Sequence, residues 1–295
     1  MARVPTTLLF CCDPLSPRKV DDHFAEQAAI ARAIGAIVAL LDHDALLAGH
    51  TAAAVSRVAR DSGELWYRCW MIPSQRYREL AQALSSRGCS LAVAPDQYAS
   101  AHELPGWYPS FEELTPRTVW SPSGPGEIPD ESALAQLVTP LGDGPGIVKD
   151  YVKSRKHEWD TACYIPDLRD TANLRRVVEN FVELQGEFLA GGLVLRQFED
   201  FTDTADTPAS EARVWWLDGE PILIGPHPDN PAAHVEPDLT AIAPAVSRLG
   251  CRFITTDVAR RVDGVWRVIE VGDAQVSDLP STVDPTALIG PLVKP

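Results

Sequence analysis

A short basic run follows an apolar segment near the middle of the chain. It carries Lys149, Lys153, Arg155 and Lys156 against the single acid Asp150, whereas the whole chain has a formal net charge of −15. An acidic protein that concentrates cations in one loop attracts anions to that loop. The run therefore predicts an anion-binding loop, with a merely solvated strand end as the alternative.

Two carboxylates near the C-terminus have a spacing that would let them share a cation. An Asp-Gly pair at 263–264 lies between two strand-like runs, and as a two-residue turn it would pair Val262 with Val265. Counting outward, Asp257 then faces Glu270, with Cβ atoms about 5 Å apart. Carboxylates so close repel each other unless a divalent cation such as Mg²⁺, which prefers oxygen ligands, lies between them. A register shifted by one residue is the alternative, and it would separate the two side chains.

Two arginines on strand-like segments complete a set of groups suited to phosphate. Arg196 lies in the apolar run 192–198, and Arg213 begins the run 213–217. Lysine and arginine neutralise phosphate oxygens, and Mg²⁺ bridges them. The chain has neither a GxxxxGKS/T loop nor a GxGxxG motif after its first strand. The combination predicts a triphosphate site that uses neither motif.

The N-terminal part of the chain alternates strands with helices. Apolar runs predict strands at 6–12, 36–41, 64–70 and 89–94, with helices at 21–33 and 74–84 between them. Such alternation implies right-handed crossovers and a mostly parallel sheet. Asp13, Arg68 and Trp70 lie at or near strand ends, where ligands of α/β folds usually bind, although a single residue at such a place is more often structural.

The rest of the chain has a different character. Prolines between 104 and 145 break up any long element, so this segment is expected to connect two domains, with a short helix at 130–137 and packed aromatic anchors. Beyond it, strands are predicted at 147–152, 161–165, 192–198, 213–217 and 221–224, and helices at 174–185 and 239–249. The pair Asp218-Gly219 between two of these strands predicts a hairpin.

Composition bounds the class of protein. With 295 residues the chain suffices for one large domain or two of ordinary size. No apolar run approaches the roughly 18 residues of a membrane span, and the N-terminus lacks a signal-peptide pattern. The acidic balance argues against wrapping duplex nucleic acid. Six cysteines without CxxC spacing are expected to be free thiols of a cytoplasmic protein rather than a zinc site.

In the order and spacing of its segments the chain resembles the ATP-grasp superfamily, and more narrowly the clade named for two arginines and a lysine. The segments that carry the resemblance are Tyr67–Trp70, Leu114–Pro116, Ile147–Ser154, Leu193–Phe198, Arg213 and Val268–Asp273. Together they cover nearly the whole chain. The resemblance implies an α/β and α+β fold, with a Rossmann-like pre-ATP-grasp domain at 1–110, a proline-rich connecting segment at 111–145 and a two-subdomain ATP-grasp domain at 146–295.

The resemblance also implies where ATP binds. The residues expected to bind it are Lys149, Lys153, Ser154, Lys156, Gln197, Phe198 and Glu199. The lysines and Ser154 would bind the phosphates, and the backbone of 197–198 would receive adenine. Glu199 or Asp200 would hold the ribose hydroxyls.

Two arginines and three carboxylates are expected to serve the reaction and its metal. The resemblance assigns Arg213 to the transferred phosphoryl group or acyl phosphate, whereas Arg196 either contacts phosphate or is a structural arginine paired with Glu199 or Glu211. The expected Mg²⁺ ligands are Asp257, Glu270 and Asp273. The usual Glu-x-Asn motif of the superfamily is altered, because Gly272 stands at the asparagine position and Asp273 follows it.

The implied activity is ATP-dependent ligation. A carboxylate attacks the γ-phosphate to give an acyl phosphate and ADP, and an amine then displaces phosphate to form an amide or peptide bond. The expected partners are a small-molecule or peptide carboxylate and an amine, and a homodimer is common in such ligases. The alternatives are a kinase-like phosphotransferase and a non-catalytic ATP-binding module that recognises a peptide or an RNA end. The presence of the lysine, Arg213 and the metal pair favours a catalytically active enzyme. The altered Glu-x-Asn motif is the feature that is compatible with a non-catalytic ATP-binding module.

Overall fold

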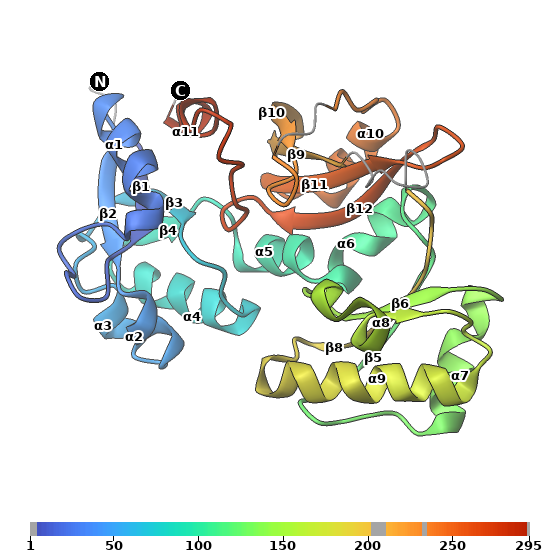
Figure 1. The fold of residues 1–295 in the computed structure, drawn as a ribbon. Coiled ribbons are helices and arrows are strands. Elements are labelled where there is room, and N and C mark those ends of the chain that lie inside the picture. The colour runs from blue at the N-terminus through green and yellow to red at the C-terminus, as the bar shows by residue number, and fades with distance from the viewer. Residues whose placement is uncertain (1–4, 202–210, 232–234, 294–295) are drawn as a thin grey trace. The chain divides into compact units, whose positions relative to one another are not determined.

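The computed structural model describes residues 5–201, 211–231 and 235–293. The chain forms two compact units (Figure 1). The first unit comprises Met1–Ala101, Ser210–Val258 and Glu270–Pro295, and the second comprises His102–Ala209 and Ala259–Ile269. Each unit is a set of segments that contact one another. The domain boundaries expected from the sequence, at 110 and 145, remain predictions. None of the helices in the described ranges is both long enough and apolar enough to cross a membrane.

The first unit contains the predicted parallel sheet. Its strands are β2 (Ile37–Leu41), β1 (Thr7–Cys11), β3 (Gly63–Arg68) and β4 (Cys89–Leu91), in that order, and each neighbouring pair is parallel. The helices of this N-terminal part are α1 (Ala25–Ala33), α2 (His43–Leu47), α3 (Thr51–Ala54), α4 (Ser74–Ser85) and α5 (Pro95–His102). Strand β1 is buried along its whole length, as expected for the centre of a parallel sheet covered on both faces. All four predicted strands are thus present, although the two predicted at 64–70 and 89–94 end earlier, at Arg68 and Leu91.

A second sheet of the first unit carries most of the predicted chemistry. Its order is β10 (Glu220–Pro226), β9 (Glu211–Leu217), β11 (Phe253–Arg260) and β12 (Trp266–Asp273). Two further helices are α10 (Ile242–Leu249) and α11 (Thr286–Val293). The predicted hairpin at Asp218-Gly219 is confirmed, because β9 and β10 pair antiparallel around it. Both turn residues have positive φ, 50° for Asp218 and 87° for Gly219, as a two-residue type I′ turn requires.

The predicted two-residue turn at Asp263-Gly264 is wrong. The Arg261 N–H donates to the Val265 carbonyl at 2.9 Å, and the Gly264 N–H donates to the Arg261 carbonyl at 2.8 Å, so the loop has three residues. Gly264 takes the left-handed conformation, at φ 87°, that ends such a loop with a bulge. The direct pairing of Asp257 with Glu270 was obtained by counting outward from a two-residue turn. A three-residue loop therefore removes the basis for that pairing.

The second unit is built on an antiparallel sheet with helices. The strand order is β5 (Thr118–Pro122), β8 (Gly192–Gln197), β6 (Gly146–Asp150) and β7 (Tyr164–Ile165). Its helices are α6 (Leu104–Phe111), α7 (Glu131–Val138), α8 (Trp159–Ala162) and α9 (Thr171–Gln185). The amphipathic helix α9 buries Leu174, Val177 and Phe181 in a core shared with Val148 and Leu195 of the sheet.

Two expectations for the second unit need correction. The proline-rich segment is more than a connection, since it contributes helix α6 and strand β5, although the short helix expected at 130–137 is present as α7. The strand expected at 161–165 is shorter than predicted: α8 runs to Ala162, and only Tyr164 and Ile165 form a strand, β7.

Candidate functional site

The basic loop begins with a buried carboxylate that organises the backbone. Asp150, the last residue of β6, is fully buried. Its Oδ1 accepts the backbone N–H groups of Val152 at 2.7 Å and Lys153 at 2.5 Å. Its Oδ2 accepts from the Gln185 side-chain amide at 2.6 Å and from the Ala190 N–H at 3.1 Å. The only acid of the run is therefore the anchor of the loop, a role that the sequence reasoning missed.

Replacing Asp150 by asparagine is expected to destabilise the protein by about 2–4 kcal/mol. The amide has the same shape, but its NH₂ group would face the Gln185 and Ala190 donors and leave buried polar groups unpaired. The measurement is the free energy of unfolding in urea. The control is Asp130→Asn, because exposed Asp130 uses one oxygen to cap helix α7 and asparagine caps equally well. Equal stabilities of the two variants would contradict the anchoring role.

The cations of the loop differ in environment. Lys149 lies on β6 and is only 5% exposed, whereas Lys153 and Lys156 are exposed. Ser154 forms an antiparallel bridge with Lys149, so the chain folds back on the end of β6. The Arg155 side chain is held by a hydrogen bond, since its Nη2 donates to the Leu184 carbonyl at 3.1 Å. Lys153 and Lys156 are thus the cations of the run that extend into solvent.

The residues predicted at the end of β8 lie in a densely bonded part of the second unit. Arg196 is buried and donates to the Ile269 carbonyl at 2.6 Å and to the Thr115 hydroxyl. These partners differ from the Glu199 or Glu211 carboxylates considered for its structural alternative. Glu199 instead accepts a bidentate pair from Arg267 at 2.8 and 2.9 Å.

Aromatic rings gather next to this strand end. The Phe198 ring lies 5.3 Å from that of Tyr164 and 6.0 Å from that of Trp159, and the Trp159 and Tyr164 rings stack. The backbone N–H groups of Gln197 and Phe198 donate to the Arg117 and Pro145 carbonyls. Trp159 and Tyr164 were not selected from the sequence, because isolated aromatic residues are far more often structural.

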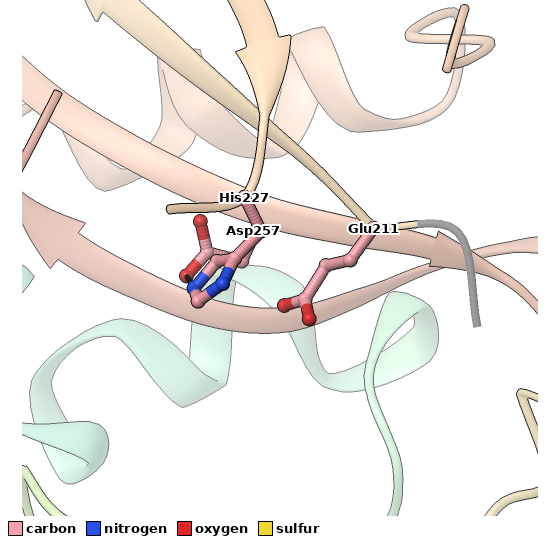
Figure 2. Close-up of side chains that lie close together, drawn as sticks. All are labelled: Glu211, His227 and Asp257. Atoms are coloured by element: carbon pink, nitrogen blue, oxygen red, sulfur yellow. Dashed lines mark ion pairs between the residues drawn. The ribbon is translucent and has the colours of Figure 1, made fainter. Parts of the chain in front are cut away.

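A cluster of ionisable side chains lies on the second sheet of the first unit. Glu211 begins β9, His227 follows β10, and Asp257 lies within β11 (Figure 2). Ligand atoms of these three residues all lie within 4.8 Å of one another, and they are called the acidic cluster below. Arg213 grips Asp257 through two hydrogen bonds of 2.7 and 2.8 Å, and its Nη2 lies 3.0 Å from the His227 Nε2. The structure thus brings the predicted Arg213 and Asp257 together.

The two carboxylates of this cluster have very different pKa values, because Arg213 binds the carboxylate of Asp257, whereas burial dominates at Glu211. Burial would raise the pKa of Asp257, but the Arg213 guanidinium and His227 outweigh it and lower that pKa to about 2. Burial, followed by the charges of Asp257 and Glu270, raises the pKa of Glu211 to about 7. Burial opposes the charged form of Arg213, yet Asp257 and then Glu270 raise its pKa overall. Burial is therefore the main reason for the raised pKa of Glu211, and the carboxylates of Asp257 and Glu270 add to it.

The other two predicted metal ligands lie in different surroundings. Glu270 is near enough to act electrostatically on Arg213 and Glu211. Asp273 is fully buried, and its Oδ1 accepts both the backbone N–H and the side-chain amide of Gln275 at 3.0 Å. Burial raises the pKa of Asp273 to about 7. It lies outside the acidic cluster, in a polar group with Gln275 and Tyr77.

Solved structures with a similar fold match nearly the whole chain. The RimK domain protein ATP-grasp from Sphaerobacter thermophilus has a TM-score of 0.61 at 16% identity and covers 98% of this chain and 99% of its own. D-cycloserine synthetase DcsG has a TM-score of 0.62 at 15% identity, with 97% and 99% covered. The ATP-grasp ligase PsnB, complexed with a minimal precursor, Mg and ADP, has a TM-score of 0.56 at 14% identity, with 97% of each chain covered. These likenesses establish a mixed α/β ATP-grasp fold of helices and several sheets.

Family membership confirms the resemblance drawn from the sequence. Residues 140–292 match the ATP-grasp domain of family 3 in the clade named for two arginines and a lysine, and the chain belongs to that family. No curated protein matches it. The matched range contains Lys149, Arg213 and the acidic cluster.

Proposed function

We propose that this protein is an ATP-dependent carboxylate–amine ligase that forms an amide or peptide bond and releases ADP and phosphate. The observation that carries the proposal is the immobilised Arg213, which both oxygens of Asp257 hold within an acidic cluster. A cation fixed in this way stabilises developing negative charge without reorganising. Membership in an ATP-grasp family, whose fold PsnB and DcsG share, supports the same reaction class.

The acidic cluster fits a divalent cation. Glu211 and Asp257 offer carboxylate oxygens, the ligands that Mg²⁺ prefers. Glu270 is close enough to interact electrostatically with Glu211. Burial and then the charges of Asp257 and Glu270 raise the pKa of Glu211, and a bound cation would offset the repulsion among these carboxylates. We assign Mg²⁺ to Glu211, Asp257 and Glu270; when bound, it would neutralise phosphate charge of ATP. Asp273 is left out of this set, because it is fully buried in the polar group with Gln275 and Tyr77, outside the acidic cluster.

The nucleotide is assigned to the second unit. Lys149, Lys153, Ser154 and Lys156 bind the phosphates in this proposal, because the Asp150 anchor presents a short loop with two solvent-facing cations. Adenine is assigned to the backbone of 197–198 beside the Phe198 ring cluster, and the ribose to Glu199 or Asp200. Base–aromatic contacts of this kind stabilise binding without demanding a particular base.

The reaction then needs positioning more than a nucleophilic side chain. The substrate carboxylate attacks the γ-phosphorus, the bond from that phosphorus to the bridging oxygen breaks, and ADP leaves, while Arg213 stabilises the negative charge of the transferred phosphoryl group. The amine attacks the acyl carbon, phosphate leaves, and the nitrogen loses a proton. Arg196, whose guanidinium donates to Ile269 and Thr115, supports the strand that carries this chemistry.

Further assignments follow from the family and the chain together. The parallel sheet of the first unit is proposed to be a Rossmann-like pre-ATP-grasp domain of about 1–110, joined through 111–145 to an ATP-grasp domain from 146 onward. All six cysteines are free and buried, which fits a reducing cytoplasm. The substrates are proposed to be a small-molecule or peptide carboxylate and an amine, with a homodimer as the form to test first.

Nucleotide products test the proposal. The protein is incubated with Mg-ATP and pooled amino acids and peptides, and ADP, AMP and phosphate are quantified. N-acetylated substrates supply a carboxylate without an amine, and C-terminally amidated substrates supply an amine without a carboxylate. We expect ADP only when both groups are present. ADP with a phosphorylated product from the N-acetylated set would indicate a kinase-like transferase, and AMP would contradict both mechanisms.

A further inference from the structure

A cavity of about 340 Å³ lies in the first unit at the carboxyl ends of the parallel strands. It is lined by Cys11, Cys12, Pro14, Pro17, Asp21, Asp42, His43, Asp44 and Trp70. Asp44 is exposed and Trp70 is 37% exposed, so the cavity opens to solvent at these residues, whereas Cys11 is buried in its wall. Two thiols in its wall, those of Cys11 and Cys12, take no part in the proposed ligation.

Cys11 has a second cysteine beside it. Strands β1 and β3 run parallel, with Phe10 opposite Arg68, and the next residues along the two strands are Cys11 and Cys69. Neighbouring strands lie about 4.8 Å apart, which is within the Cα separation that a disulfide spans. The Cys69 thiol donates to the Leu9 carbonyl at 3.3 Å, and the N–H of the next residue, Trp70, donates to the Cys11 sulfur at 3.4 Å, so both sulfur atoms lie between the ends of β1 and β3.

The surroundings of Cys11 favour its thiolate. Burial opposes this, but hydrogen bonds from Cys69, His43 and the Trp70 N–H, the last at 3.4 Å, prevail and lower the pKa of Cys11 to about 6. Cys12 lines the same cavity, yet burial raises its pKa. Because thiolates rather than thiols react with peroxides, Cys11 is expected to be the more reactive of these two sulfurs.

We propose that Cys11 and Cys69 form an oxidation site for small hydroperoxides that enter this cavity. The Cys11 thiolate attacks the peroxide oxygen, the O–O bond breaks, and Cys11 becomes a sulfenic acid as the departing oxygen takes a proton. The Cys69 thiol then attacks the sulfenic sulfur, a disulfide forms, and the sulfenic oxygen leaves as water. Two electrons pass from the sulfur pair to one peroxide molecule.

The disulfide would act on a chain of contacts within the first unit. Trp70 follows Cys69 directly, and its ring lies 4.4 Å from that of His23. The His23 Nε2 lies 2.9 Å from an Asp278 carboxylate oxygen, and the Asp278 carbonyl accepts from the Arg213 Nη1 at 3.3 Å. We therefore expect oxidation to lower the activity that depends on Arg213, a consequence that rests on the proposed function.

The test is peptide mapping of the intact protein after treatment with hydrogen peroxide near pH 7.5. The expected product is a Cys11–Cys69 cross-linked peptide that dithiothreitol reverses. In Cys69→Ser the sulfenic acid cannot be resolved, so a dimedone adduct is expected at Cys11 instead. The matched control, Cys12→Ser, removes the other thiol of the cavity and is expected to leave the cross-link unchanged.

Several results would overturn the proposal, each independent of any ligase assay. One is a native protein in which Cys11 stays reduced while peroxide oxidises other cysteines. Another is equal labelling of Cys11 and Cys12 by dimedone, because the two environments would then not differ. A Cys11–Cys12 disulfide would show that Cys69 is not the partner.

Discussion

Replacing Arg213 by alanine is expected to destabilise the protein by about 3–5 kcal/mol and to abolish ligation. The side chains of Arg213 and Asp257 are only 13% and 7% exposed, and two hydrogen bonds join them. Removing one partner of a buried pair leaves the other charge uncompensated, which accounts for the size of the loss. Stability is measured by urea unfolding and activity by ADP release. Arg213→Lys is expected to retain part of the stability but little activity, because lysine cannot reproduce the bidentate grip.

The control for this prediction is Arg169→Ala. Arg169 also makes two side-chain hydrogen bonds to an aspartate, Asp167, but the side chains are 64% and 42% exposed. Solvent-exposed pairs contribute little to stability, so this variant is expected to remain near wild-type stability. If both arginine variants lost the same small free energy of unfolding, the result would contradict the claim that Arg213 compensates the buried charge of Asp257.

Replacing Lys149 by methionine is expected to weaken ATP binding by roughly 10- to 100-fold, since a hydrogen bond to a charged group contributes about 1.5–3 kcal/mol. Methionine keeps an apolar stem of similar length on the buried β6 strand, so the change removes chiefly the ammonium charge. The dissociation constant of Mg-ATP is measured by calorimetry. The control is exposed Lys19→Met, for which an unchanged constant is expected. Unaltered affinity in the Lys149 variant would remove this residue from the phosphate site.

Two Asp-Gly pairs in the chain show how far turn chemistry can be predicted. Asp218 adopts positive φ, and its hairpin has the two-residue turn that the sequence predicts. Asp263 does not, because its carboxylate accepts the Val265 N–H at 3.2 Å and pairs with the Arg261 guanidinium at 2.6 Å. The dipeptide alone cannot distinguish these outcomes, since the side chains beside it decide the loop length.

The acidic cluster was partly predictable. Glu211 lies two residues before Arg213, so the two share one face of a strand, and this spacing could have identified Glu211. His227 could not be found in the same way. The ladder between β9 and β10 shifts between Pro221 and Leu223, and this irregularity places the His227 N–H on the Glu211 carbonyl at 3.0 Å. A register counted from the turn without that shift misplaces the histidine.

Strand β5 was not predicted, because the prolines of its segment were taken to exclude regular structure. Pro122 is the last residue of this strand, and β5 lies at the edge of its sheet. Proline is tolerated at both kinds of position because no ladder hydrogen bond is lost there. The antiparallel pairing of β5 with β8 is a long-range contact that composition does not reveal.

The central claim, that the carboxylates of this sheet hold the metal of Mg-ATP, is tested most directly by thermal unfolding with ligand. Near 100 times the dissociation constant, Mg-ATP should stabilise the wild-type protein by about 2.7 kcal/mol, and ATP with EDTA by much less. The double variant Asp257→Asn with Glu270→Gln is expected to lose the Mg²⁺-dependent part of this shift. The matched pair Asp218→Asn with Glu220→Gln, exposed on the same sheet, is expected to keep it. An undiminished Mg²⁺-dependent shift in the Asp257 and Glu270 double variant would contradict the account.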